Sequence, residues 1–160
     1  MSFKFTEENL EKIEKLKKKY PSPEALSLPL LWMAQYQDGY VSIDAIDEVA
    51  RISTKAPMEI YAVATFYTMF NLKPIGKYKI QLCKTLSCML CGEQEILAHI
   101  EDKLGIKENE TTEDGLFTLK RVECMGSCGT APMMAINDDY HEDLTPEKLD
   151  AILEELKNGN

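Results

Sequence analysis

Four cysteines in two close pairs constrain this chain more than any other feature. The first pair is Cys83 and Cys88, and the second pair is Cys124 and Cys128. The residues before Cys83 alternate like a strand, an amphipathic helix follows Cys88, and the residues before Cys124 alternate again. Two strands of one sheet that are joined by a helix run parallel, and parallel neighbours end at the same edge. We therefore expect all four thiols to meet at one edge of a sheet.

The residues around these cysteines favour an iron–sulfur centre of the [2Fe-2S] type. Gly126 and Gly129 allow the backbone to approach a bulky inorganic core, because they have no Cβ atom. Ser87 and Ser127 can donate hydrogen bonds, and donors aimed at sulfur tune the potential of such a cluster. The expected ligands are the four paired cysteines: Cys83, Cys88, Cys124 and Cys128.

Other chemistries remain open for these thiols. Structural zinc usually takes cysteines two residues apart, whereas here four and three residues separate the partners. A Rieske centre needs two histidine ligands, and neither His99 nor His141 lies in a loop beside a cysteine. The fifth thiol, Cys91, makes a Cys-x-x-Cys motif with Cys88 ahead of a helix, which is typical of a disulfide oxidoreductase.

The rest of the pattern predicts an α+β chain in two parts. The first part, residues 1–74, has the apolar spacing of a helical region, with helices from Thr6 to Tyr20, over 25–36, after Ser42 and over 57–70. The second part, residues 75–160, has the pattern of a mixed four-stranded sheet with helices, and its elements are strands over 78–82, 116–122, 133–136 and near Tyr140, and helices over 93–104 and after Thr145. We expect the aromatic residues of the helix over 57–70, Tyr67 and Phe70 among them, to pack inside the helical region.

Composition excludes several classes of partner. A net charge of −9 over 160 residues argues against a surface for nucleic acid or anionic membrane. No segment approaches the roughly 20 apolar residues of a membrane span, and the N-terminus has no apolar signal-peptide core. A cytoplasmic protein is expected, and cysteines in that reducing compartment are typical metal ligands or redox thiols.

The residues quoted so far, with three further segments, carry a resemblance to a known family. The chain resembles the NuoE-type subunit of NADH:quinone oxidoreductase (respiratory complex I) over nearly its whole length. The further segments are Leu-Pro-Leu-Leu at 28–31, Ala-Val-Ala-Thr-Phe-Tyr-Thr-Met-Phe at 62–70 and Ala-Pro-Met-Met at 131–134. The resemblance implies an N-terminal helical bundle and a thioredoxin-like [2Fe-2S] ferredoxin domain, with Cys83, Cys88, Cys124 and Cys128 as the cluster ligands. Cys91 stands where members of the family commonly have a basic residue.

The resemblance also implies partners and a role. Such a chain transfers single electrons to or from FMN on a larger flavoprotein subunit, which also holds the NADH site. In agreement, the chain has no Gly-x-Gly-x-x-Gly motif, so we expect no complete active site on it alone. Other complex I subunits complete the assembly, which places the chain at the inner face of the cell membrane. The alternatives are the equivalent diaphorase subunit of an NAD-linked hydrogenase or formate dehydrogenase, and a stand-alone thioredoxin-like ferredoxin.

Overall fold

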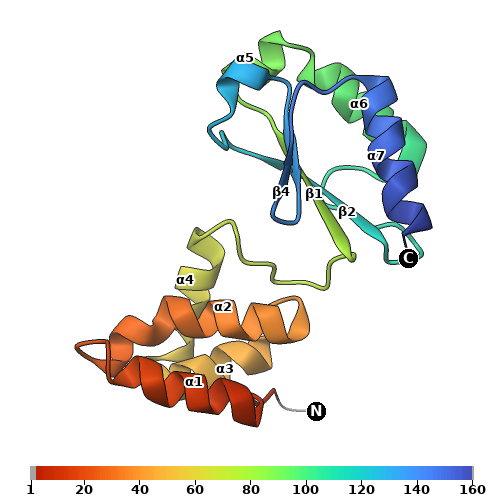
Figure 1. Cartoon of the computed structure of the whole chain (residues 1–160). Coiled ribbons are helices and arrows are strands. Elements are labelled where there is room, and N and C mark those ends of the chain that lie inside the picture. The colour runs from red at the N-terminus through yellow and green to blue at the C-terminus, as the bar shows by residue number, and fades with distance from the viewer. Residues whose placement is uncertain (1–2, 160) are drawn as a thin grey trace. The chain divides into compact units, whose positions relative to one another are not determined.

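The computed structural model describes residues 3–159 and divides the chain into two compact units (Figure 1). The helical unit ends at Pro74, and the sheet unit begins at Ile75. None of the helices within the described range has the length and apolar character needed to cross a lipid bilayer.

The helical unit contains four α-helices and one 3-10 turn, and side-chain caps begin two of the helices. The elements are α1 (Glu7–Lys17), η1 (Pro23–Leu26), α2 (Ser27–Asp38), α3 (Ile43–Ser53) and α4 (Pro57–Phe66). The hydroxyl of Thr6 accepts a hydrogen bond from the Asn9 backbone N–H at 3.3 Å, and Ser42 caps α3 through Ala45 at 3.1 Å. Such caps satisfy backbone donors that the first helical turn leaves free.

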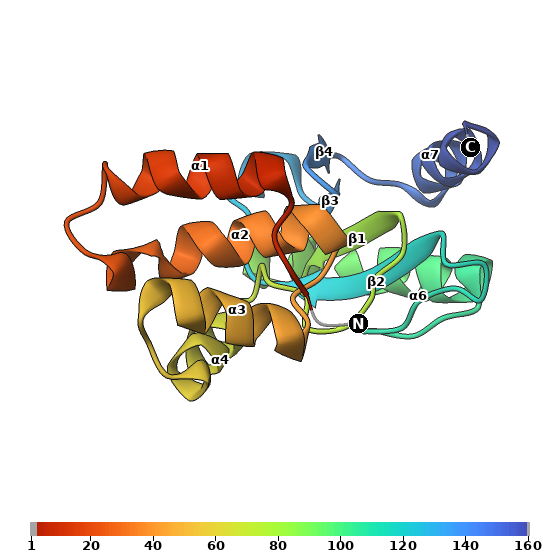
Figure 2. The same ribbon diagram turned by 90° about the horizontal axis from the view of Figure 1, so that it is seen from below.

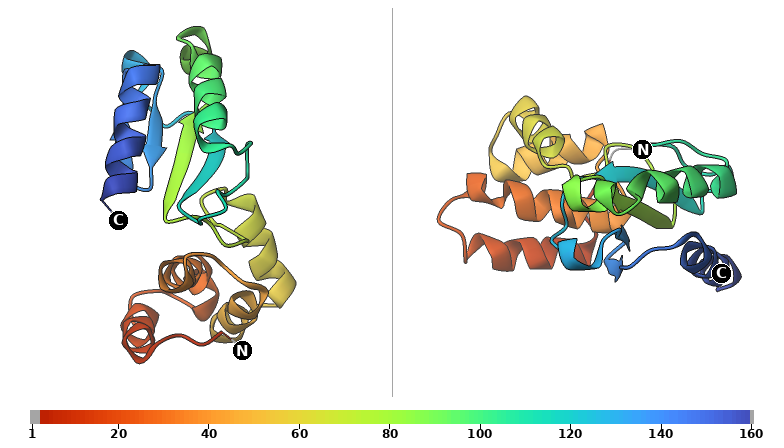
Figure 3. Two further views of the ribbon diagram at one scale, coloured as in Figure 1. Left: turned by 90° about the vertical axis from the view of Figure 1, so that its right-hand side faces the viewer. Right: turned by 90° about the horizontal axis from the view of Figure 1, so that it is seen from above.

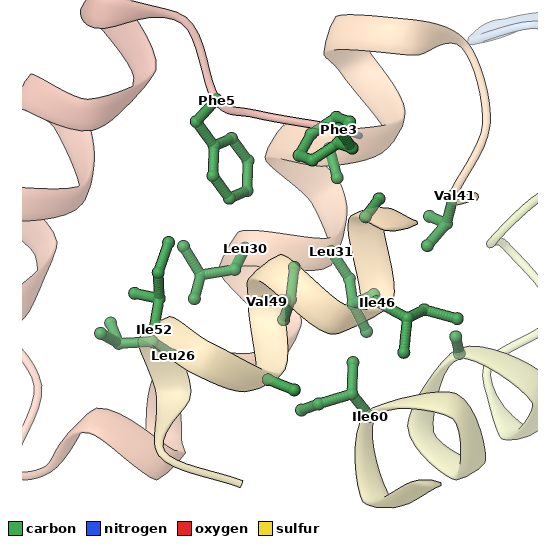
Figure 4. Close-up of a cluster of buried hydrophobic side chains, with 14 of the residues drawn as sticks. Phe3, Phe5, Leu26, Leu30, Leu31, Val41, Ile46, Val49, Ile52 and Ile60 are labelled. Atoms are coloured by element: carbon green, nitrogen blue, oxygen red, sulfur yellow. The ribbon is translucent and has the colours of Figure 1, made fainter. Parts of the chain in front are cut away.

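Apolar side chains from all these helices form the core of the helical unit. Leu30 and Leu31 of α2, Val49 of α3 and Ile60 of α4 are inaccessible to solvent and point toward a common centre (Figure 4). The first three helices lie side by side around this core (Figure 2). Burial of this apolar surface, rather than helix propensity, is the main source of stability for helices of this length.

Two helices of this unit end earlier than the sequence pattern predicts. The first ends at Lys17, and Tyr20 lies beyond it in a turn in which the Leu16 carbonyl oxygen accepts the Tyr20 backbone N–H. The fourth ends at Phe66 because the buried amide of Gln35 holds the following segment: its Nε2 donates to the Met69 carbonyl, and its Oε1 accepts the Asn71 N–H. Phe70 is buried as expected, but Tyr67 is 37% exposed, so the expectation that it packs inside the unit was wrong.

The sheet unit is built on four strands in the order β2-β1-β3-β4. Its elements are β1 (Tyr78–Cys83), α5 (Leu86–Leu90), α6 (Glu93–Leu104), β2 (Phe117–Val122), the 3-10 turn η2 (Cys128–Thr130), β3 (Met134–Ile136), β4 (Asp139–His141) and α7 (Pro146–Asn158). The first two strands are parallel and end together at the pair Cys83 and Val122, while β3 pairs antiparallel with both β1 and β4. The mixed sheet and the parallel pairing predicted from the sequence are confirmed.

One face of this sheet carries the core of the unit. Ile80 of β1, Leu119 of β2 and Met134 of β3 pack against Ile100 of α6 and Leu153 of α7, all of them buried. Helices α6 and α7 therefore run along the same face, as the left view of Figure 3 shows. The cysteines lie outside this core, at the ends of β1 and β2 and in the segments that follow these strands.

Candidate metal centre

The parallel strands deliver the two cysteine pairs to one edge of the sheet. Cys83 is the last residue of β1, and Cys88 lies in α5, the short helix that follows. Cys124 comes two residues after β2, and Cys128 begins η2. The structure thus brings together the four thiols that the sequence predicted would meet. It differs in one detail, because Cys88 lies on a helix and not in an irregular loop.

The first pair is buried and the second pair is exposed. Cys83 and Cys88 are 2% and 1% exposed, and they pack with Met133 in a small apolar cluster to which Met125 and Ala131 add partly buried contacts. Cys124 and Cys128 are exposed, and their sulfur atoms lie 3.5 Å apart. The site therefore has a dry side made by the first loop and a side open to solvent made by the second.

Within each pair, one thiol has a lowered pKa and the other a raised pKa. Burial acts to raise the pKa of Cys83, but hydrogen bonds from Thr85, Cys88 and the Met125 backbone hold it below the ordinary value. Burial, together with the hydrogen bond to Cys83, raises the pKa of Cys88 to about 11. Within each pair one sulfur is thus the better hydrogen-bond acceptor and the other the donor, and a metal that binds both sulfur atoms as thiolates displaces the thiol protons.

The exposed pair follows the same rule through different contacts. The backbone N–H of Gly126 donates to the Cys124 sulfur at 3.4 Å, and this bond, with that from Cys128, lowers the pKa of Cys124. The hydrogen bond to Cys124 raises the pKa of Cys128. Gly126 has a φ of +93°, a backbone conformation that glycine adopts without strain, and this conformation aims its N–H at the sulfur.

Hydroxyl groups from the first loop reach sulfur atoms of the second. The Thr85 hydroxyl lies 3.3 Å from the Cys83 sulfur and also hydrogen-bonds to Cys124. Ser87 hydrogen-bonds to Cys128, as its position in the sequence suggested. The charge of Cys83 acts on both members of the exposed pair. All four sulfur atoms therefore share one electrostatic environment.

Two further residues brace the exposed loop from β4 and the segment after it. The Tyr140 hydroxyl donates to the Met125 carbonyl oxygen at 3.0 Å, and the Glu142 carboxylate accepts hydrogen bonds from Ser127 and Thr130. The expectation that Ser127 donates a hydrogen bond to a cysteine sulfur was wrong, because its hydroxyl donates to the Glu142 carboxylate. Sequence reasoning missed Thr85, Tyr140 and Glu142, and only the threonine, two residues after Cys83, had a local signal.

The other candidate ligands lie away from this centre. Cys91 ends α5 as an exposed thiol, and the structure assigns it no place in either pair. His99 lies on α6, where its ring contacts Asp150 at 2.8 Å, and His141 ends β4. Among residues 3–159, no three histidine, cysteine, aspartate or glutamate side chains are grouped around the position of a single metal ion. The candidate donor set is two pairs of thiols, which matches the four cysteine ligands that a [2Fe-2S] cluster takes.

Comparison with known proteins agrees with this donor chemistry. The family model for thioredoxin-like [2Fe-2S] ferredoxins matches residues 13–157. The chain is 49% identical over 160 residues to the E subunit of the NADH-quinone oxidoreductase of Rickettsia bellii, covering 98% of this chain and 96% of that protein. It is also 49% identical to the mitochondrial NADH dehydrogenase (ubiquinone) flavoprotein 2 of Dictyostelium discoideum, covering 98% of this chain and 65% of that protein.

A solved structure shares the fold at lower sequence identity. The NAD+-reducing [NiFe]-hydrogenase in its air-oxidized state superposes with a TM-score of 0.71 and 23% identity, over 81% of this chain and 23% of the hydrogenase chain. The resemblance to the NuoE-type subunit noted from the sequence is confirmed by the Rickettsia relative. With two thiol pairs at one sheet edge and a family match over residues 13–157, this chain belongs to the thioredoxin-like [2Fe-2S] ferredoxin family.

Proposed function

We propose that the chain is the electron-transferring subunit of an NADH–quinone oxidoreductase, and that Cys83, Cys88, Cys124 and Cys128 hold its [2Fe-2S] cluster. The observation that carries this proposal is the meeting of two thiol pairs at the end of parallel strands β1 and β2. The near full-length relative from the NADH-quinone oxidoreductase of Rickettsia bellii supports the choice of complex. A [2Fe-2S] cluster, when bound, supplies a one-electron redox couple.

The protein's own groups prepare the site for negative charge. The backbone N–H groups of Met125, Gly126 and Met133 point at the sulfur atoms of Cys83, Cys124 and Cys88 respectively. The hydroxyls of Thr85 and Ser87 add two further hydrogen bonds to sulfur. Donors fixed in this way stabilise thiolates and make it easier for the centre to accept an electron.

The two cysteine pairs differ in exposure, so one side of the site faces the protein interior and the other side faces solvent. Met133 and the buried pair exclude water from one side, while Cys124 and Cys128 lie at the surface. Electron exchange with a separate protein needs a short path to the surface, and the exposed pair supplies it. A one-electron centre cannot accept a hydride, so the reaction with NADH belongs to a flavin, FMN, on a partner subunit.

The assembly also sets the location. As a component of the oxidoreductase, the chain sits at the inner face of the cell membrane through its partners and not through a span of its own. The helical unit, which ends at Pro74, then has a role of its own as a docking element for the partner flavoprotein.

The proposal is tested by isolating the tagged chain from its native cells under mild conditions. We expect an FMN-containing partner to accompany it, and NADH to reduce the cluster within that complex, as followed by electron paramagnetic resonance. A cluster-bearing chain that isolates alone, with no reduction by NADH in any fraction, contradicts the proposal and indicates a stand-alone ferredoxin. Isolation with hydrogenase or formate dehydrogenase subunits also contradicts it and indicates a diaphorase.

A further inference from the structure

Among the residues that the structure describes, two ion pairs join the segments that carry the cysteine pairs: an exposed one between Lys84 and Glu123 at 3.5 Å, and a largely buried one between Glu93 and Arg121 at 2.9 Å. Glu93, the first residue of α6, is 0% exposed and is the one fully buried carboxylate between residues 3 and 159. The Arg121 guanidinium of β2 meets it with two hydrogen bonds, from Nε to Oε1 at 2.9 Å and from Nη2 to Oε2 at 3.2 Å. Gln94 donates a third hydrogen bond to Oε2 at 2.9 Å. The carboxylate is therefore well provided with donors in a dry place.

The position of this pair along the chain is the key observation. Glu93 follows α5, which holds Cys88, after the two residues Cys91 and Gly92. Arg121 lies three residues before Cys124, and the β1–β2 ladder ends one residue after it. Beyond that ladder the two cysteine segments have no further strand pairing to hold them together, within the part of the chain that the structure describes. The ion pair thus connects them close to the point at which each leaves the sheet.

Stability alone is a poor explanation for an ion pair whose carboxylate is fully buried and whose arginine side chain is only 21% exposed. Two charges lose their hydration on burial, and apolar side chains of similar volume often stabilise a protein equally well. The pair contributes a defined relative orientation, because two parallel hydrogen bonds fix both the distance and the angle between the guanidinium and the carboxylate. Here they fix the start of α6 relative to the end of β2.

We propose that Glu93 and Arg121 are positioning residues for the [2Fe-2S] cluster, which hold the two cysteine segments at the separation that four-thiolate binding requires. This inference rests on the proposed function. A second carboxylate, that of Glu108, lies 3.9 Å from Arg121 Nη1 on the more exposed side. The proposed effect of Glu93 and Arg121 is on the geometry of the sulfur atoms and on how firmly they hold the cluster. Both side chains act through the segments to which they belong, α6 and β2, and not through contact with sulfur.

The test measures how fast the cluster is lost to an iron chelator, by the decay of its visible absorbance, in the full-length protein. We expect Arg121→Gln and Glu93→Gln each to speed the loss by about 10-fold or more, the effect typical of removing a residue that supports metal ligands. The double variant pairs two neutral amides and leaves no buried charge unpaired, since Glu108, the other carboxylate near Arg121, has a side chain that is 38% exposed. We expect it to recover most of the wild-type rate. The proposal is overturned if the single variants lose the cluster at the wild-type rate. It is also overturned if the acceleration of cluster loss in the double variant equals the product of the two single accelerations.

A conservative variant separates positioning from folding. Arg121→Lys keeps the charge but cannot donate two parallel hydrogen bonds. We expect it to keep the wild-type unfolding midpoint, to lose the cluster faster and to broaden the resonance spectrum of the reduced cluster. A wild-type release rate and spectrum in this variant overturn the proposal even if the glutamine variants fail to fold.

A matched control exists in the helical unit. Arg51 and Glu48 form a similar two-hydrogen-bond pair at 2.8 and 2.7 Å, between neighbouring turns of α3. Glu48→Gln should leave cluster release unchanged, and an equal acceleration there overturns the assignment to Glu93 and Arg121. A wild-type protein without iron contradicts the proposed function itself. A wild-type cluster with unaffected variants contradicts the positioning role alone.

Discussion

The Tyr140 hydroxyl donates a hydrogen bond to the Met125 carbonyl oxygen across 3.0 Å and so ties β4 to the loop between Cys124 and Cys128. The backbone N–H of Met125 points at the Cys83 sulfur, and the next N–H, of Gly126, points at Cys124. One side chain distant in sequence thereby fixes a peptide segment whose donors serve both cysteine pairs.

Removal of this hydroxyl should loosen the cysteine loop. A single hydrogen bond contributes about 0.5–1.5 kcal/mol, and the 53% exposure of Tyr140 puts this one at the lower end. We expect Tyr140→Phe to speed cluster loss to a chelator by about 2- to 5-fold, as followed by visible absorbance. Tyr36→Phe, at an exposed tyrosine of the helical unit, is the control. Equal rates in the two variants contradict the role given to Tyr140.

Serine substitutions separate the proposed ligands from the fifth thiol. Replacement of Cys83, Cys88, Cys124 or Cys128 by serine should lower cluster content severely, because a serine oxygen is a poorer ligand for iron than a thiolate. Cys91→Ser should leave the absorption spectrum largely intact, because that thiol is exposed and belongs to neither pair. Loss of the cluster in Cys91→Ser, with retention in any of the other four variants, shows that Cys91 is a ligand in place of one of these four cysteines.

Gly76 should tolerate no side chain. A Cβ atom at this position would lie 2.9 Å from the backbone carbonyl carbon and oxygen of Leu116, and the Gly76 N–H donates to the Thr118 hydroxyl at 2.6 Å. We expect Gly76→Ala to lower the free energy of unfolding by about 1–3 kcal/mol, as measured by denaturant titration. An unchanged midpoint for Gly76→Ala contradicts the close approach of these backbones.

His141 should make the sheet unit sensitive to acid. Burial, with a smaller effect of Lys148, lowers the pKa of His141 from its ordinary value of 6.5. The unfolded chain therefore binds the proton more readily, so stability falls as the pH drops through 6.5, and the loss is complete below the folded-state pKa. Wild-type protein should lose more unfolding free energy between about pH 7.5 and about pH 5.5 than His141→Gln. An identical loss in both proteins contradicts this assignment.

Much of the fold could be predicted because its signals are local. The helix over 93–104 was predicted with the bounds that α6 has, since its apolar spacing is regular and Gly105 ends it at a φ of +66°. The helices predicted from Thr6 and after Ser42 also formed, and the structure shows that these two residues cap them. The convergence of the thiols followed from one topological rule, that a helix between two strands of a sheet makes them parallel.

What sequence reasoning missed depends on contacts between distant residues. Helix α5 has only five residues, too few for a periodic pattern to appear. The outward face of α4, with Met58 and Phe66 73% and 77% exposed, has the same apolar character as its buried face, so spacing alone does not tell which face is covered. The pairing of Glu142 with Ser127 and of Glu93 with Arg121 joins residues 15 and 28 positions apart, and no local motif marks either pair.

The most direct test of this account is analysis of iron and acid-labile sulfide in the purified full-length chain, with the resonance spectrum of the anaerobically reduced protein. We predict about two irons and about two sulfides per chain, and one spin per cluster on one-electron reduction. A colourless chain that binds one zinc and gives no signal contradicts the central claim that the paired thiols hold a two-iron centre.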